Sequence, residues 1–170
     1  LSVGSGNPGM TNVWRTLGWK PALPVALLDA LKGTLAAWAG FALTGSPLWA
    51  LLAGITAVLG HSFSFWIGFR GGKSVLTAFG VFLYLSPLAS LGAFVAWAVV
   101  MAAFRFVSLA SIIAALALPA LVWLERGAAP SFFAALPVCA FVVLRHRANI
   151  ARLARGTEPR FRGKSGGASA

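Results

Sequence analysis

Three polar segments of the chain carry side chains that can bind an anion, and the first is residues 4–15, Gly-Ser-Gly-Asn-Pro-Gly-Met-Thr-Asn-Val-Trp-Arg. Glycines allow backbone conformations that turn successive N–H groups toward one point, which makes an anion-binding nest. Ser5, Thr11 and Asn12 can add side-chain donors, and Arg15 can supply a planar fork that is always charged. The segment therefore predicts an anion site, with a plain glycine-rich turn as the alternative.

The second segment is residues 60–74, Gly-His-Ser-Phe-Ser-Phe-Trp-Ile-Gly-Phe-Arg-Gly-Gly-Lys-Ser, directly before an apolar run. A turn of Gly71, Gly72 and Lys73 that opens a helix presents free N–H groups, the positive end of the helix dipole and an ammonium. Phosphate binding is the interpretation we favour. A basic loop that flanks a membrane helix explains Arg70 and Lys73 equally well. A single histidine such as His61 is more often a packed side chain.

The third segment is residues 145–159, Arg-His-Arg-Ala-Asn-Ile-Ala-Arg-Leu-Ala-Arg-Gly-Thr-Glu-Pro, which follows the last apolar run. If it is helical, His146 and Asn149 share a face at i and i+3, and the helix can lie amphipathically on a membrane surface. The alternative is a polybasic anchor to anionic lipid, which would explain Arg152 and Arg155. Such an anchor does not explain the carboxylate of Glu158.

Two further charged features lie within or between apolar runs. Asp29 and Lys32 stand at i and i+3, and we expect a structural ion pair, because a buried charge is costly unless it is paired. Arg105 stands with Ser108 between two runs, where interfacial snorkelling and substrate contact are both open. The single Cys139 predicts a small buried hydrophobe, and the sequence offers neither a disulfide nor a metal-ligand cluster.

The elements that must position these residues are apolar helices. The chain is 59% hydrophobic and 10% charged, against roughly 25% charged in soluble domains. Together these values predict an all-α, polytopic transmembrane bundle with short amphipathic or re-entrant pieces. We expect about six spans, at residues 22–44, 48–59, 75–85, 88–104, 106–124 and 132–144.

Two of these runs are too short to cross a bilayer alone. Eleven or twelve residues cover about 18 Å of a hydrocarbon core of about 30 Å. These helices must therefore borrow flanking residues or stop beside polar loops, and residues 60–74 can serve both needs.

If all six runs cross, one side of the membrane collects every Lys and Arg except Lys32 and Arg126. The positive-inside rule makes that side cytoplasmic, and it brings all three polar segments to one face. We expect one domain over residues 1–170, with a flexible tail at 162–170. The net charge of +11 does not indicate nucleic-acid binding, because the basic residues follow apolar segments and form no aromatic-studded polar face.

Taken together, the three segments resemble the signature of the PlsY family of acyl-phosphate:glycerol-3-phosphate acyltransferases. The resemblance rests on residues 4–18, 60–77 and 146–161, the last ending Gly-Thr-Glu-Pro-Arg-Phe, and it covers nearly the whole chain. The family has about seven helices, so we expect one helix before Leu1 to be absent. Met10 and Ser74 depart from the small Ala and Gly of the family, and we expect the Ser74 side chain to narrow the phosphate turn.

The resemblance implies transfer of a fatty acyl group from acyl phosphate to the 1-hydroxyl of glycerol 3-phosphate, without a cofactor, in a monomer of the bacterial inner membrane with its site on the cytoplasmic side. It implies catalytic roles for Ser5, Lys73, His146 and Asn149. The residues expected to bind substrate or phosphate are Ser5, Gly6, Asn7, Thr11, Asn12, Arg15, His61, Gly71, Gly72, Lys73, Arg105, Ser108 and Glu158.

An acyl phosphate is already activated, so the work expected of the protein is positioning and charge stabilisation. An oxygen of a bound phosphate can accept the hydroxyl proton, and His61 is the alternative base. Two rival functions are a small transporter or lipid-binding protein with a basic rim, and an interaction scaffold. Formation of lysophosphatidic acid from palmitoyl phosphate and glycerol 3-phosphate would separate all three.

Overall fold

The computed structural model describes residues 4–161, which form eight α-helices and one 3₁₀ turn. The predicted flexible tail lies outside these residues. The elements in chain order are α1 (Met10–Leu17), α2 (Trp19–Thr44), α3 (Pro47–Ser62), η1 (Phe65–Ile67), α4 (Val75–Leu85), α5 (Pro87–Phe104), α6 (Val107–Arg126), α7 (Pro130–Arg145) and α8 (Arg147–Ala154).

Proline and glycine set the helix boundaries that the apolar runs left open. Pro47, Pro87 and Pro130 are the first residues of α3, α5 and α7, a position where the missing N–H costs nothing. Gly45 ends α2 in the left-handed region, at φ 68°. The short run at 48–59 is thereby extended to Pro47–Ser62.

The helices confirm the predicted all-helical membrane class. By length and composition, four segments can cross a bilayer: α2, α3 together with η1, α5 and α6. A fifth is added if α7 and α8, which are bent by 58° at their junction, count as one span. We expected six; with the fifth span counted, the remaining difference is α4, which has 11 residues, or about 16 Å.

This short helix is the centre of the bundle. It packs against α2, α3, α5 and α7, and its Val81 and Phe82 are almost fully buried. The crossing with α2 is close because both helices have glycine there: a Cβ on Gly33 would overlap the Thr77 carbonyl, and one on Gly80 would overlap that of Ala30. A helix so enclosed can end inside the bundle, because its neighbours cover it.

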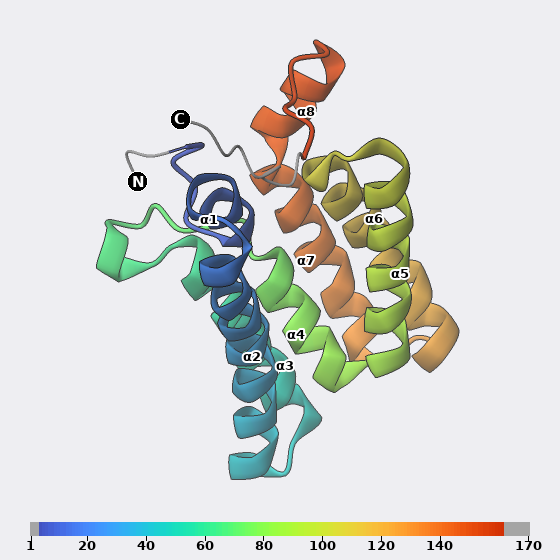
Figure 1. Ribbon diagram of the computed structural model, residues 1–170. Coiled ribbons are helices and arrows are strands. Elements are labelled where there is room, and N and C mark those ends of the chain that lie inside the picture. The colour runs from blue at the N-terminus through green and yellow to red at the C-terminus, as the bar shows by residue number, and fades with distance from the viewer. Residues whose placement is uncertain (1–3, 162–170) are drawn as a thin grey trace, which may run out of the picture.

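The polar segments gather at one end of the bundle. Figure 1 shows α1, α8 and the loop between α3 and α4 at that end, whereas the α2–α3, α4–α5 and α6–α7 turns lie at the other. The segment after the last apolar run is helical from Arg147 to Ala154, and His146 lies at the bend where the chain passes from α7 into α8.

Candidate functional site

A buried carboxylate, that of Glu158, joins helices α6 and α8 at this end. Its Oε1 accepts hydrogen bonds from Ser108 Oγ on α6 at 2.6 Å and from Asn149 Nδ2 on α8 at 2.7 Å. Its Oε2 accepts one from Arg152 Nε at 2.7 Å. Burial by itself would raise the pKa of Glu158, but these three donors outweigh it and lower the pKa below its usual value. Glu158 is therefore held as an anion.

Lys73 is connected to this carboxylate through Asn149. The ammonium donates to Asn149 Oδ1 at 2.5 Å, so the amide of Asn149 bridges Lys73 and Glu158. The pKa of Lys73 is lowered to about 8, mainly by burial; the charge of Glu158 opposes this shift, and the charges of Arg152, Arg15 and Arg145 add to it. The second and third polar segments thus meet, as the sequence predicted, at the Lys73 ammonium.

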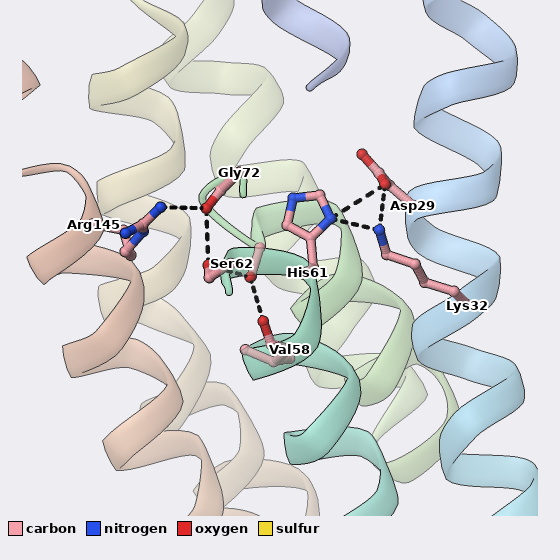
Figure 2. Close-up of polar contacts among 8 residues, drawn as sticks. Asp29, Lys32, Val58, His61, Ser62, Gly72 and Arg145 are labelled. Atoms are coloured by element: carbon pink, nitrogen blue, oxygen red, sulfur yellow. Dashed lines mark hydrogen bonds and ion pairs between the residues drawn. The ribbon is translucent and has the colours of Figure 1, made fainter. Parts of the chain in front are cut away.

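The turn of Gly71 and Gly72 is held against the end of α3. Gly71 N donates to the Ser62 carbonyl at 3.0 Å and Gly72 N to that of His61 at 3.2 Å, while Ser62 Oγ donates to the Gly72 carbonyl at 2.8 Å (Figure 2). A Cβ on Gly71 would overlap the His61 carbonyl, and one on Gly72 would overlap the His61 ring and the Pro8 carbonyl. Glycine is required here, and the first polar segment lies directly beside this turn.

Ser74 does not narrow the turn, and our expectation there was wrong. Its hydroxyl is buried against α3, where it donates to the Val58 carbonyl at 2.6 Å and lies 2.8 Å from Ser62 Oγ. The residue has φ 59°, a left-handed value that glycine adopts without strain, which gives a physical reason for the small residue expected at this position.

The glycine-rich segment before α1 is folded on itself. Asn12 Oδ1 accepts hydrogen bonds from Ser5 N at 2.8 Å and Ser5 Oγ at 3.2 Å. Gly6 has φ 66°, and Asn7 is half-buried beside Gly9. From α1, Arg15 Nη2 donates to the Pro159 carbonyl at 3.2 Å, next to Glu158. The first segment therefore joins the same cluster.

His146 is buried at the bend between α7 and α8. Its Nδ1 lies 2.8 Å from the Val142 carbonyl, and when Nδ1 carries the ring proton it donates to that oxygen. Nε2 is then the acceptor nitrogen of the ring. The geometry allows His146 to orient or accept a proton, on the same side of the bundle as Asn149.

Asp29 and Lys32 form the predicted ion pair, at 2.6 Å, and His61 joins it. His61 Nδ1 lies 3.4 Å from Asp29 Oδ1 and 2.5 Å from Lys32 Nζ (Figure 2). The opposite edge of the His61 ring faces Gly72. His61 therefore lies between the α2 ion pair and the glycine turn. No local sequence pattern around His61 indicated this arrangement.

Arg105 contributes through its backbone. It ends α5 at φ 59°, its side chain is exposed, and its carbonyl accepts a hydrogen bond from Phe161 N at 2.6 Å. The Phe161 ring packs edge-on against Trp14 of α1, with ring centroids 5.1 Å apart. The residues that carry Glu158 are thus fastened at both ends across the top of the bundle.

An apolar cleft of about 520 Å³ opens beside the polar cluster and runs down between the helices. Met10, Thr11, Trp14 and Phe161 line it near the cluster, so Thr11 stands on an apolar wall. The remaining walls come from α2, α4, α5, α6 and α7 and include Phe79, Phe94, Trp97, Leu118 and Val142. Its start next to Lys73 is formed by Val75 and Leu76, the first residues of α4.

Two arginines have contacts that the sequence did not indicate. Arg152, which a lipid anchor would have explained, binds Glu158 instead. Arg145 Nη2 donates to the carbonyls of Gly71 and Gly72 at 2.9 and 3.0 Å. The Gly71 and Gly72 partners of Arg145 are distant in sequence, and the Glu158 partner of Arg152 lies beyond a turn. Sequence patterns alone explain each arginine as a basic residue at the end of a membrane helix. Among residues 4–161, no group of three His, Cys, Asp or Glu side chains could hold a metal ion.

The chain is similar to known proteins over nearly its whole length. A family model described as glycerol-3-phosphate acyltransferase matches residues 1–156. The chain is 46% identical over 159 residues to the glycerol-3-phosphate acyltransferase of Synechococcus sp. (strain JA-3-3Ab), covering 94% of this chain and 78% of the relative. It is 42% identical over 161 residues to that of Geobacter sulfurreducens, covering 95% and 83%.

Two solved structures are similar over the same range. Both are crystal structures of PlsY, an integral membrane glycerol 3-phosphate acyltransferase. The glycerol 3-phosphate form has a TM-score of 0.87 and 39% identity, covering 94% of this chain and 80% of that one. The lysophosphatidic acid form also has a TM-score of 0.87, with 38% identity and coverage of 94% and 82%.

Proposed function

The chain belongs to the glycerol-3-phosphate acyltransferase family, and from this premise we propose that its acyl donor is an acyl phosphate bound with its chain in the apolar cleft. The protein is an integral membrane acyltransferase that acts on glycerol 3-phosphate. Family membership excludes the scaffold and transporter alternatives.

The observation that carries the proposal is that the cleft and the polar cluster share a border. Val75 and Leu76 line the cleft directly after Lys73, and Trp14 lines it directly before Arg15. An acyl chain of a dozen or more carbons suits a long apolar groove, since each buried CH₂ contributes about 0.8 kcal/mol. A chain in this cleft places its activated head beside cationic donors.

The reaction needs little covalent help from the protein. The 1-hydroxyl oxygen of glycerol 3-phosphate attacks the acyl carbonyl carbon, the new ester C–O bond forms, and the anhydride C–O bond to phosphate breaks. The hydroxyl proton passes to an oxygen of the phosphate, so the products are lysophosphatidic acid and inorganic phosphate. Because phosphate is a good leaving group, stabilisation of charge on two phosphates is the main requirement.

We assign this stabilisation to the amides of Gly6 and Asn7 and to the charges of Arg15 and Lys73. The amides of Gly71 and Gly72, which the sequence predicted to be free, donate to α3 carbonyls, and that of Ser5 donates to Asn12, so these residues shape the site through their backbone. Asn149, whose amide is shared between Lys73 and Glu158, fixes the ammonium in place. His146, with Nε2 as acceptor, orients the attacking hydroxyl. Asn12 supports the glycine-rich segment, Thr11 lines the apolar cleft, and Ser108 and Arg105 support the Glu158 end of the cluster.

Charge distribution supports the remaining parts of the proposal. The end that bears the polar cluster carries Arg15, Lys73, Arg145 and Arg152, whereas the opposite turns carry Arg126. By the positive-inside rule, the cluster lies on the cytoplasmic side of the bacterial inner membrane. The cluster and cleft are built from a single chain, so we propose that a monomer is active.

The test uses purified protein in detergent micelles with palmitoyl phosphate or palmitoyl-CoA, glycerol 3-phosphate, and detection of lysophosphatidic acid and phosphate. We expect lysophosphatidic acid to form when the acyl donor is palmitoyl phosphate and not when it is palmitoyl-CoA. Equal turnover with palmitoyl-CoA would contradict the proposed donor.

Two variants test the phosphate roles. Lys73→Ala and Arg15→Ala each remove charge-assisted contacts of about 1.5–3 kcal/mol, so turnover should fall roughly 10- to 100-fold or more. The exposed Lys20 is the matched control, and Lys20→Ala should retain normal turnover. Near-normal rates in folded Lys73→Ala protein would contradict the assignment. If His146→Ala and His61→Ala both keep substantial rates, proton transfer to the substrate phosphate is supported over a histidine base.

A further inference from the structure

Arg145 is the last residue of α7, and its guanidinium reaches across to the glycine turn that precedes Lys73 (Figure 2). One nitrogen, Nη2, donates to two consecutive carbonyls, those of Gly71 and Gly72. The face of the same guanidinium lies 5.7 Å from the centroid of the Phe63 ring. Arg145 thus grips the turn from one side while α3 holds it from the other.

The contact comes from a different part of the chain than the other restraints on the turn. Ser62 and the carbonyl of His61 belong to α3, which the turn follows directly. Arg145 belongs to α7, which continues through His146 into α8 and Asn149. A rigid link between Arg145 and the Gly72 carbonyl therefore fixes Lys73 on one side against His146 and Asn149 on the other.

The guanidinium is retained at a cost. Its Nε is buried and makes no hydrogen bond with any of the residues 4–161, and a buried unsatisfied donor is unfavourable. A shorter polar or apolar side chain would avoid that cost and lose the double contact. Lysine would keep the charge but not the planar group with several donors in fixed directions.

We propose that Arg145 is a positioning residue that places the Lys73 ammonium, acting through the Gly71–Gly72 carbonyls. The proposal rests on the proposed function, in which Lys73 binds substrate phosphate. Arg145 does not touch substrate. It sets the turn so that the ammonium stands between Asn149 and the start of the apolar cleft.

The charges around Lys73 give a readout that a purely structural role would not change. Lys73 faces Glu158, which raises its pKa, and Arg152, Arg15 and Arg145, which lower it, with His146 also nearby. Removing the Arg145 charge while the turn stays near its place raises the Lys73 pKa above the present value of about 8. The alkaline limb of kcat/KM for glycerol 3-phosphate then moves to higher pH, because Lys73 keeps its proton longer.

The experiment compares Arg145→Gln, Arg145→Lys and the control Arg126→Gln, which changes an exposed arginine at the opposite end. Two quantities are measured between pH 6 and pH 10: kcat/KM for glycerol 3-phosphate, and the rate at which acetic anhydride acetylates Lys73, followed by mass spectrometry. The second reports the Lys73 pKa without any need for turnover.

We expect kcat/KM to fall roughly 10- to 100-fold in Arg145→Gln, as for the loss of a charged hydrogen-bonded contact, with a raised Lys73 pKa. Arg145→Lys should restore the titration of Lys73 but not the full rate, and Arg126→Gln should change neither. Rates within twofold of wild type in Arg145→Gln, or an unchanged Lys73 titration in both folded variants, would overturn the proposal. If Arg145→Gln does not fold, the lysine variant alone decides through its rate. A shifted titration in a protein that never uses acyl phosphate would overturn the proposed donor and leave the positioning role standing.

Discussion

Glu158 and Glu125 are two of the three acidic residues of the chain, and they lie at opposite ends of α6. Glu158 receives Ser108 from the start of α6 and two side chains from α8, and through Asn149 it reaches Lys73. Glu125, near the end of α6, accepts the Ala89 amide of α5 at 2.7 Å and pairs with its neighbour Arg126 at 3.3 Å. The Glu158 carboxylate joins distant segments into a site, whereas the Glu125 carboxylate accepts a hydrogen bond from one N–H group in the first turn of α5.

This contrast teaches that the partners of a carboxylate, and not its type or burial, decide its role. Both side chains are largely buried and both accept from strong donors. Only the donors of Glu158 include a residue, Asn149, that also binds Lys73. Substitution of each glutamate tests whether the two carboxylates differ in this way.

The largest effect should come from Glu158→Gln. A neutral amide must turn its NH₂ toward one of the three donors, so at least one charge-assisted contact becomes a repulsion and Lys73 loses its indirect anion. We expect turnover to drop by roughly 100-fold or more, from one or two lost contacts of about 1.5–3 kcal/mol each. The measurement is lysophosphatidic acid formation by monodisperse protein. Wild-type turnover in a folded Glu158→Gln variant would show that Glu158, like Glu125, is not needed for activity.

An effect on stability in acid should follow from the lowered pKa of Glu158. A carboxylate whose folded pKa lies below its unfolded value of about 4.5 stabilises the fold fully above that pH. The contribution is lost as pH falls through the lower, folded pKa. Thermal unfolding in micelles between pH 6 and pH 3 should therefore show a loss of stability below about pH 4.5 that is smaller in Glu158→Gln. If the melting temperatures of wild type and Glu158→Gln fall equally with pH, Glu158 is not the source of the acid-dependent loss of stability.

The smallest effect should come from Glu125→Ala. The variant removes a cap from the first turn of α5 and should cost about 0.5–2 kcal/mol, or a few degrees in Tm. Glu125→Gln keeps an acceptor for the Ala89 amide and should cost less. Turnover per folded molecule should stay within about twofold in both, since no lost contact reaches the cluster. A large loss of turnover would show that the far end of α6 is coupled to the site.

The helices could be predicted from the sequence because apolar composition and proline or glycine boundaries act locally. The predicted runs at 88–104 and 106–124 differ from α5 and α6 by at most two residues at each end. The Asp29–Lys32 pair was also predictable, since both members lie on one helix face.

The contacts made by Arg145 and His61 could not be predicted in this way. Arg145 and the Gly71 carbonyl are separated by 74 residues, and His61 and Lys32 by 29. Each of these residues had a sufficient local explanation, as a topological charge or a packed ring. The Ser74 hydroxyl was misjudged for a related reason: its left-handed backbone turns the side chain into α3, and no neighbouring residue type signals that. The roles assigned to the site residues remain predictions.

The enclosed position of α4 and of the glycine turn before it has a consequence for where the proposed substrates would meet. Gly72 lies beside His61, and His61 beside Asp29, which is ten residues along α2, or about 15 Å from its first turn. If Trp19 and Lys20 mark the lipid headgroups, a layer only about 5–8 Å deep on each leaflet, Lys73 stands below the surrounding phosphates. Glycerol 3-phosphate then descends from water to the level at which fatty chains begin. The new lysophospholipid is then formed at its resting depth and can leave sideways into the leaflet, without first rising toward water.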